Sequence, residues 1–344
     1  MKYYQIISTI SLAATFLSSC AIAVRQPTVS VVEDTLTSQS AFVPLDTPTI
    51  ELLKATATER PEPTPTWTIT PSPSPSPLPE AAQEVPVRFA VIGDYGLDSA
   101  GLSAVAALVK SWSPDFIVTV GDNNYPNGSA ETIDENIGKY FHEYIGNYSG
   151  MYGEGAEENQ FFPTLGNHDW YTKDAQPYFD YFDLPGNERY YSITRGPVEI
   201  FALNSDSREP DGVGRSSVQG QWLEDALADS TAPWQIVVLH HAPYSSGPHG
   251  GTDWAQWPYD DWGADAVLAG HDHTYERLEY DGIPYFVNGA GGSVLYHFED
   301  IQLNSQVRYN AEFGAMLVEV TSTSMNFQFV TTSGVVVDQV TVGK

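Results

Sequence analysis

The sequence predicts an α/β sandwich with two central sheets, and three observations carry this prediction. Short apolar runs typical of buried strands recur through the second part of the chain. Amphipathic helical patterns fall between some of these runs, and residues 315–342 alternate like strands, with Thr and Ser turns and no helix. Two stacked sheets with helices outside them bury the apolar face of every such element.

The expected strands are short, rich in β-branched and aromatic residues, and bounded by Gly, Pro or polar residues. They cover residues 87–92, 116–120, 198–203, 235–239, 264–269 and 284–287. Apolar residues that share one face predict two helices between them, one through Leu102, Val105, Leu108 and Val109 and another through Trp222, Leu223, Ala226 and Leu227.

The N-terminus is typical of a targeting segment. Lys2 supplies positive charge, and residues 6–17 form an apolar stretch that is too short to span a bilayer. Cys20 directly follows Leu17-Ser18-Ser19, which resembles the lipobox of bacterial lipoproteins. We therefore expect residues 1–19 to be a lipoprotein-type signal peptide. Lipid on Cys20 would anchor an exported chain to a membrane, at the cell surface or in the periplasm.

Residues 20–84 form a linker that is rich in Thr, Pro and Ser, with repeated prolines at 61–65 and 71–77. Such a composition cannot bury enough apolar surface to fold, and repeated prolines favour an extended polyproline II spacer. The sequence therefore predicts a disordered, semi-rigid linker that holds one folded domain, residues 85–344, away from the membrane.

The charge of the chain excludes one class of partner. With 44 acidic and 15 basic residues, the net charge is −29, whereas binding to nucleic acid requires clustered Lys and Arg. An acidic surface suits a protein outside the cytoplasm, and an anion site is compatible with this charge where metal ions supply the positive charge. A single cysteine excludes an intramolecular disulfide. No sequence feature indicates a protein partner.

Residues of metal-ligand type follow several of the expected strands or lie in loops beyond them. Ligands bind at the carboxyl ends of strands in open α/β sheets, and imidazole is the commonest metal ligand. Five such groups are difficult to explain as turns alone: Gly93-Asp94, Gly121-Asp122-Asn123-Asn124-Tyr125, Gly166-Asn167-His168-Asp169, His240-His241-Ala242-Pro243 and His271-Asp272-His273.

The last of these groups leaves two arrangements open. His271 and His273 share a face if the backbone stays extended past Gly270, because residues two apart on a strand point the same way. A loop at the end of the strand would instead aim the two imidazoles at two adjacent ions.

These groups together resemble the five motifs of the calcineurin-like metallophosphoesterases. Tyr125, three residues after Asp122, and the segment Thr274-Tyr275-Glu276-Arg277 further resemble the purple acid phosphatases, including the tartrate-resistant type. The resemblance implies a four-layer αββα sandwich with two central mixed sheets, and residues 85–344 as its catalytic domain. It also implies two metal ions.

The resemblance assigns each motif residue a role. It makes Asp94, Tyr125 and His273 ligands of Fe(III), Asn167, His241 and His271 ligands of a divalent ion (Zn, Fe or Mn), and Asp122 the bridge between the ions. Hard carboxylate and phenolate donors suit Fe(III), and imidazole and amide donors suit the divalent ion. His240 lies beside His241 and is an alternative ligand, although the His-x-Pro spacing favours His241.

The resemblance also implies that His168 and His249 contact the phosphate and help to protonate the leaving alkoxide. We therefore expect an extracytoplasmic acid phosphatase that hydrolyses small-molecule phosphate monoesters. A phosphodiesterase with the same ions is one alternative, since an insertion such as residues 130–160 would shape the pocket. A tethered, metal-dependent binding protein for phosphate or a cell-wall polymer is the other.

Overall fold

The computed structural model describes residues 84–344. The predicted signal peptide, the lipidation site at Cys20 and all but the last residue of the predicted linker lie outside the described residues, so these remain predictions. Within residues 84–344, no helix combines the length and the apolar composition needed to cross a membrane.

One of the two sheets has six strands, three of which run parallel. Its order is β13 (Val336–Gly343), β12 (Ser324–Thr331), β11 (Gly314–Val320), β1 (Val87–Ile92), β2 (Phe116–Thr119) and β3 (Phe161–Pro163). Strands β1, β2 and β3 are parallel, whereas β11, β12 and β13 continue the sheet in antiparallel fashion. The carboxyl ends of β1, β2 and β3 therefore meet at one edge.

The other sheet has seven strands and is also mixed. Its order is β10 (Ser305–Tyr309), β8 (Tyr275–Tyr280), β9 (Ile283–Asn288), β7 (Ala266–Gly270), β6 (Trp234–His241), β5 (Val198–Ala202) and β4 (Tyr191–Arg195). Strands β5, β6, β7 and β9 are parallel, so this sheet also gathers its loops at one edge.

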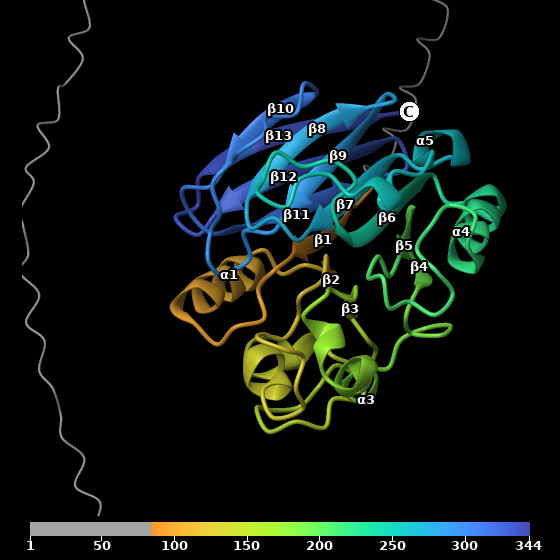
Figure 1. Ribbon diagram of the computed structural model, residues 1–344. Helices are drawn as coiled ribbons and strands as arrows, with labels where there is room; N and C mark the ends of the chain where they lie inside the picture. Colours follow the sequence, from red (N-terminus) through yellow and green to blue (C-terminus); the bar gives the residue numbers. More distant parts are fainter. Residues whose placement is uncertain (1–83) are drawn as a thin grey trace, which may run out of the picture. The chain divides into compact units, whose positions relative to one another are not determined.

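Helices cover the outer faces of both sheets. Helix α1 (Ala100–Ser111) begins at Ser99, whose side chain accepts a hydrogen bond from the backbone of Leu102, and α4 (Val218–Asp229) begins in the same way at Ser217. Helix α1 lies beside β1 and β11, and α4 lies beside β5 and β6 (Figure 1). The shorter helices are η1 (Asp134–Gly138), α2 (Lys139–Phe141), η2 (His142–Tyr144), η3 (Asp169–Tyr171), η4 (Lys173–Ala175), α3 (Gln176–Tyr181), η5 (Asp253–Ala255) and α5 (Tyr259–Trp262).

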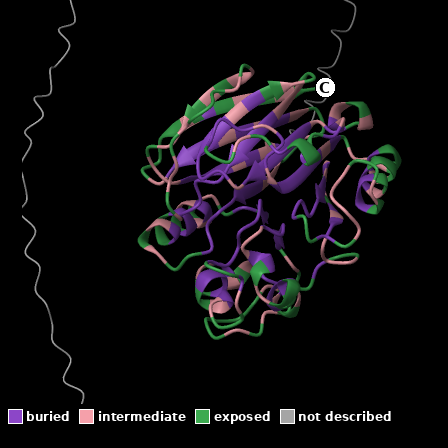
Figure 2. Cartoon of the chain, in the orientation of Figure 1, coloured by how far each residue is buried: buried purple, intermediate pink, exposed green. Residues whose placement is uncertain are grey.

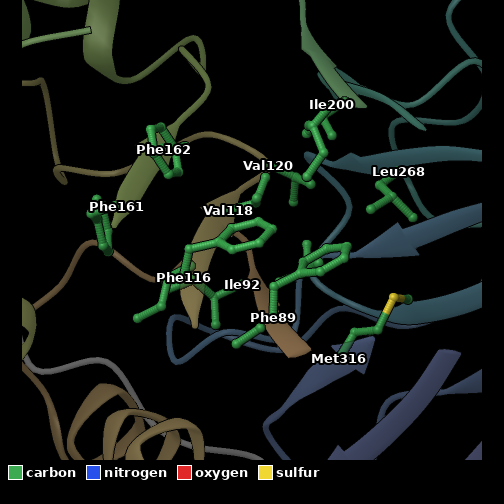
Figure 3. Close-up of a cluster of buried hydrophobic side chains, with 14 of the residues drawn as sticks. Phe89, Ile92, Phe116, Val118, Val120, Phe161, Phe162, Ile200, Leu268 and Met316 are labelled. Atoms are coloured by element: carbon green, nitrogen blue, oxygen red, sulfur yellow. The ribbon is translucent and has the colours of Figure 1, made fainter. Parts of the chain in front are cut away.

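The main core lies between the two sheets. Phe89 of β1 stacks on Phe116 of β2, with ring centroids 4.8 Å apart. Ile200 and Leu268 of the seven-stranded sheet join the same buried cluster as Met316 of β11 (Figure 3). Burial is concentrated in the strands, whereas the helices expose one face (Figure 2).

The predicted fold class is confirmed, including the two mixed sheets. All six strands predicted between residues 87 and 287 are present, as are both predicted helices and the C-terminal strands. The prediction missed β3, β4, β8 and β10, which are short or pack only one side. Residues 130–160, predicted as an insertion, contain η1, α2 and η2.

Candidate metal centre

The predicted ligands lie together because both sheets direct the carboxyl ends of their parallel strands to the same region. Asp94 follows β1, Asp122 follows β2, and Asn167 follows β3. His240 is the next-to-last residue of β6, and His271 follows β7. The backbone ties neighbouring loops together, since the amide of Asp94 donates to the carbonyl of Gly121 at 3.1 Å.

One group of ligands surrounds the hydroxyl of Tyr125. This hydroxyl donates to Asp122 Oδ2 at 2.9 Å and lies 3.1 Å from His273 Nε2 and 3.5 Å from Asp94 Oδ1. Asp94, Asp122 and His273 each offer a ligand atom within 4.8 Å of the others, and all three are buried. We call Asp94, Tyr125 and His273 the phenol cluster.

A second group surrounds the Nε2 atom of His240. This nitrogen lies 3.0 Å from Asn167 Oδ1, 3.2 Å from His271 Nδ1 and 3.4 Å from Asp122 Oδ1. We call Asn167, His240 and His271 the imidazole cluster. Asp122 faces the phenol cluster with one carboxylate oxygen and the imidazole cluster with the other, which is the geometry of a bridging ligand.

The geometry favours His240 over His241 as the ligand, whereas the His-x-Pro spacing favours His241. Every second residue of β6 points to the face that packs against the other sheet, where Asp122 lies. These residues are Ile236, Val238 and His240. His240 is fully buried, and its Nδ1 lies 2.8 Å from the carbonyl of Val120. In the sequence, the alternation of residues along β6 identifies His240, whereas the His-x-Pro spacing does not.

His241 has a different environment. Its Nδ1 lies 2.9 Å from Ser205 Oγ, and its ring centroid lies 4.5 Å from that of His271. Burial, together with His240 beside it, lowers the pKa of His241 to about 3. His241 therefore borders the imidazole cluster as a neutral side chain that lies outside the converging set.

Three of the candidate ligands have an unusual backbone conformation. Asp94, Asp122 and His271 have φ angles of 53°, 53° and 73°, in the left-handed region that costs non-glycine residues on the order of 1–3 kcal/mol each. The amide of His271 donates to Asp94 Oδ2 at 3.0 Å, which holds this turn. The backbone is therefore not extended past Gly270, and His271 and His273 point to different clusters, as in the second of the two arrangements.

Two glycines allow the loops to approach this closely. A Cβ atom at Gly166 would lie 2.2 Å from Asp122 Oδ1, and one at Gly121, where φ is 94°, would lie 2.5 Å from the ring of His240. Both glycines thus make room for atoms of the candidate ligands.

The donor set fits metal ions on electrostatic grounds. Among residues 84–344, the ion pairs of Asp94 and Asp122 involve only histidines, so these buried carboxylates have no Lys or Arg partner. Burial and the Asp122 and Asp94 carboxylates raise the pKa of Tyr125 well above its ordinary value of about 10. Burial, then His240 and His241, lower the pKa of His271. Although burial alone would lower them, the Asp122 and Asp94 carboxylates raise the pKa values of His240 and His273. Buried carboxylates whose counter-charges are imidazoles form a set of ligands that metal cations would stabilise.

The two histidines predicted to act on the substrate lie at opposite sides of this centre. His168 packs on Tyr125, with ring centroids 4.6 Å apart, and its Nε2 lies 3.9 Å from Asp122 Oδ2. His249 packs on His271, with ring centroids 4.1 Å apart. Both side chains are partly exposed, at 31% for His168 and 42% for His249, so both are accessible to a substrate.

Sequence reasoning missed the residues that orient these groups. Asp272 Oδ1 lies 2.9 Å from His249 Nδ1 and also accepts the backbone N–H of His249 at 3.0 Å. Tyr296 stacks on His273 with ring centroids 4.0 Å apart. The position of Asp272 between two ligands was a usable signal, whereas nothing local in the sequence marks Tyr296.

The two neighbouring histidines should differ in their effect on metal content. We expect His240→Ala to lose about one of two bound ions per chain, because its Nε2 is a converging donor atom, and His241→Ala to retain both. Elemental analysis of the purified variants measures this. Loss of metal from His241→Ala alone would restore the original assignment.

Comparisons with known proteins identify the family of this chain. The family model for calcineurin-like phosphoesterase matches residues 87–275. Purple acid phosphatase 17 of Arabidopsis thaliana is 28% identical over 244 residues, which are 61% of this chain and 70% of that protein. Tartrate-resistant acid phosphatase type 5 of Rattus norvegicus is 25% identical over 293 residues, which are 72% and 88% of the two chains.

A solved structure shares the fold. The purple acid phosphatase PPD1 from seeds of yellow lupin, Lupinus luteus, superposes with a TM-score of 0.63 at 19% identity, over 76% of this chain and 54% of that one. This chain thus spans about half of the lupin protein. The relatives confirm the predicted enzyme class, an acid-phosphatase-like hydrolase. The chain belongs to the calcineurin-like phosphoesterase family, and its similarity within that family is to the purple acid phosphatases.

Proposed function

We propose that this protein hydrolyses small-molecule phosphate monoesters at a site that holds two metal ions. The observation that carries the proposal is the position of Asp122, whose two carboxylate oxygens face separate groups of donors 2.9 and 3.4 Å away. A fully buried carboxylate is costly without positive charge beside it, and the ion pairs described for Asp122 are with histidines, with no Lys or Arg among residues 84–344.

The donors suit two different ions. Asp94, Tyr125 and His273 would hold Fe(III), and Asn167, His240 and His271 would hold Zn, Fe or Mn in the divalent state, with Asp122 shared. When bound, such a pair supplies Lewis-acid stabilisation of phosphoryl oxygens and a hydroxide nucleophile near neutral pH.

The side chains of the protein supply the proton for the leaving group. Asp272 faces Nδ1 of His249 at 2.9 Å and so favours the tautomer with a proton on that nitrogen, and it fixes the orientation of the ring. His249 can then present Nε2–H when doubly protonated and donate that proton to the departing alkoxide. His168, whose Nδ1 lies 2.5 Å from the carbonyl of Pro126, is oriented to bind a phosphate oxygen.

The cellular location forms a separate part of the proposal. The lipobox-like Cys20, the preceding apolar stretch and the net charge of −29 support an exported acid phosphatase that lipid tethers to a membrane, at the cell surface or in the periplasm. The Pro-rich linker would place the catalytic domain at a distance from that membrane.

Turnover of defined esters tests the proposed reaction. We expect the metal-loaded protein to release phosphate from 4-nitrophenyl phosphate, to hydrolyse bis(4-nitrophenyl) phosphate more slowly, and to lose both activities on chelation. Preference for the diester would indicate the phosphodiesterase alternative. Phosphate binding without turnover of either ester would indicate the binding-protein alternative.

Iron-loaded protein should be coloured, and Tyr125 should be the cause. A phenolate bound to Fe(III) absorbs visible light by charge transfer, and the raised pKa of Tyr125 means that only a strong cation would ionise it. We expect Tyr125→Phe to lose the visible band. Tyr296→Phe is the matched control and should keep the band, because Tyr296 stacks its ring on His273 and is not a proposed iron ligand. An unchanged spectrum in Tyr125→Phe would remove Tyr125 from the ligand set.

If His249 protonates the leaving group, the loss of activity in His249→Ala should depend on the leaving group of the ester. We expect His249→Ala to lower kcat on an alkyl phosphate by about 10²-fold and by much less on 4-nitrophenyl phosphate, whose leaving group needs no proton. Asp272→Asn should show the same pattern in weaker form. His297→Ala, which removes an exposed histidine, is the control. Equal losses on both esters would leave His249 with a binding or structural role.

The anchor is tested at Cys20. In a bacterial host, we expect the wild-type chain to fractionate with membranes and to carry lipid on Cys20, whereas Cys20→Ser should be released or misprocessed. Mass spectrometry of the mature N-terminus distinguishes the two. An unmodified Cys20 in a membrane-free mature chain would contradict the anchor.

A further inference from the structure

We propose that Tyr171 and Trp254 form an aromatic rim that binds the alcohol part of the substrate and selects phosphate esters of uncharged, planar aromatic alcohols. This inference rests on the proposed phosphatase function and specifies its substrate class. It assigns specificity to side chains outside both the phenol cluster and the imidazole cluster.

Tyr171 forms one end of the rim and is hydrogen-bonded to a candidate metal ligand. It lies in η3, is 55% exposed, and its hydroxyl accepts a hydrogen bond from Asn167 Nδ2 at 3.1 Å. Its ring centroid lies 5.1 Å from that of His168. The exposed ring is therefore held beside the site by its polar end, which leaves most of its apolar surface uncovered.

Trp254 ties the other end of the rim to the loop after β5. It lies in η5, is 47% exposed, and its Nε1 donates to the carbonyl of Ser205 at 3.2 Å. The hydroxyl of Ser205 lies 2.9 Å from His241 Nδ1, and the Trp254 ring centroid lies 6.1 Å from that of His241. His241 in turn contacts His271, so Trp254 borders the imidazole cluster.

Arg208 joins the two ends. Its guanidinium lies 4.9 Å from the centroid of the Tyr171 ring, and its Nη2 donates to the carbonyl of Asn167 at 3.0 Å. Its Nε donates to Asp206 at 2.7 Å, and Asp206 is the neighbour of Ser205 in the chain. The rim is thus continuous from Tyr171 through Arg208 and Ser205 to Trp254.

The charge of the rim restricts what it binds. The Asp206 carboxylate takes bonds from both Nε and Nη2 of Arg208, so the one cation of the rim is balanced by a nearby anion. The chain as a whole carries 29 net negative charges. An alcohol part with further phosphates or carboxylates would meet this negative field, and the described rim residues offer no unpaired Arg or Lys to compensate it. An uncharged ring can instead stack on Tyr171 or Trp254.

Exposed aromatic side chains are ordinary when they stand alone on a surface. Tyr171 and Trp254 differ from such side chains because the polar group of each is hydrogen-bonded to a residue of the site or of its border. These hydrogen bonds orient both rings beside the site. Stacking of one aromatic pair corresponds to about 2- to 12-fold in affinity, which sets the size of the expected effect.

Two esters that share the phosphate but differ in the alcohol test the rim. We expect wild-type protein to have a lower KM for 1-naphthyl phosphate than for 2-glycerol phosphate. Trp254→Ala and Tyr171→Ala should each raise the KM for the naphthyl ester by about 5-fold and change that for the glycerol ester by less than about 2-fold. Tyr152→Ala, which removes a partly exposed ring held at its backbone by Tyr148, is the matched control.

Calorimetric binding of the matching naphthyl and glycerol phosphonates, whose P–C bond cannot be hydrolysed, to the metal-loaded protein gives a readout that does not depend on turnover. Weaker binding of the naphthyl phosphonate alone in the two rim variants supports the rim. If the rim variants show this result and no ester is hydrolysed, the proposed function fails but the aromatic rim is still supported. Equal changes for both phosphonates, or no change in either rim variant at unchanged metal content, would overturn the rim.

Discussion

The site depends on one constraint, which is that Asp122 is buried between two sheets without a Lys or Arg partner within the described residues. An isolated buried carboxylate is too costly to persist, so its surroundings must supply compensation. Tyr125 supplies a hydrogen bond to one oxygen, and the ring of His240 faces the other. The remaining compensation is what a pair of cations would supply, and the two sheets are arranged to bring their donors to this point.

Backbone strain at the ends of strands is the consequence of that arrangement. Asp94 and Asp122 each follow a glycine that lies just beyond the end of a strand, and both have positive φ angles. A regular strand end would direct these side chains elsewhere, whereas the left-handed turn returns them to the space between the sheets. The small size of Gly166 and Gly121 then permits contact distances that a Cβ atom would block. The strained turns lower the stability of the fold but allow the candidate ligands to converge.

Much of the fold was predictable because the central strands are short, continuous apolar runs, which can be recognised from the sequence without knowledge of tertiary contacts. Strand β8 was not, since residues 275–280 mix charged and aromatic residues and are stabilised by antiparallel pairing with β9 and β10. The ligand types were predictable from the polar residues after each strand. The choice between His240 and His241 was not settled by spacing, because it depends on which face of β6 packs against the other sheet. Contacts such as His249 with Asp272, or Trp254 with Ser205, join loops whose proximity only the folded chain shows.

Crystallographic anomalous scattering from the metal-loaded protein would locate the ions and show which residues bind them. We expect two peaks, both bonded to Asp122. One should be bound by Asp94, Tyr125 and His273 and show an iron absorption edge, and the other should be bound by Asn167, His240 and His271. A single peak, or two peaks with Asp122 bonded to only one of them, would contradict it.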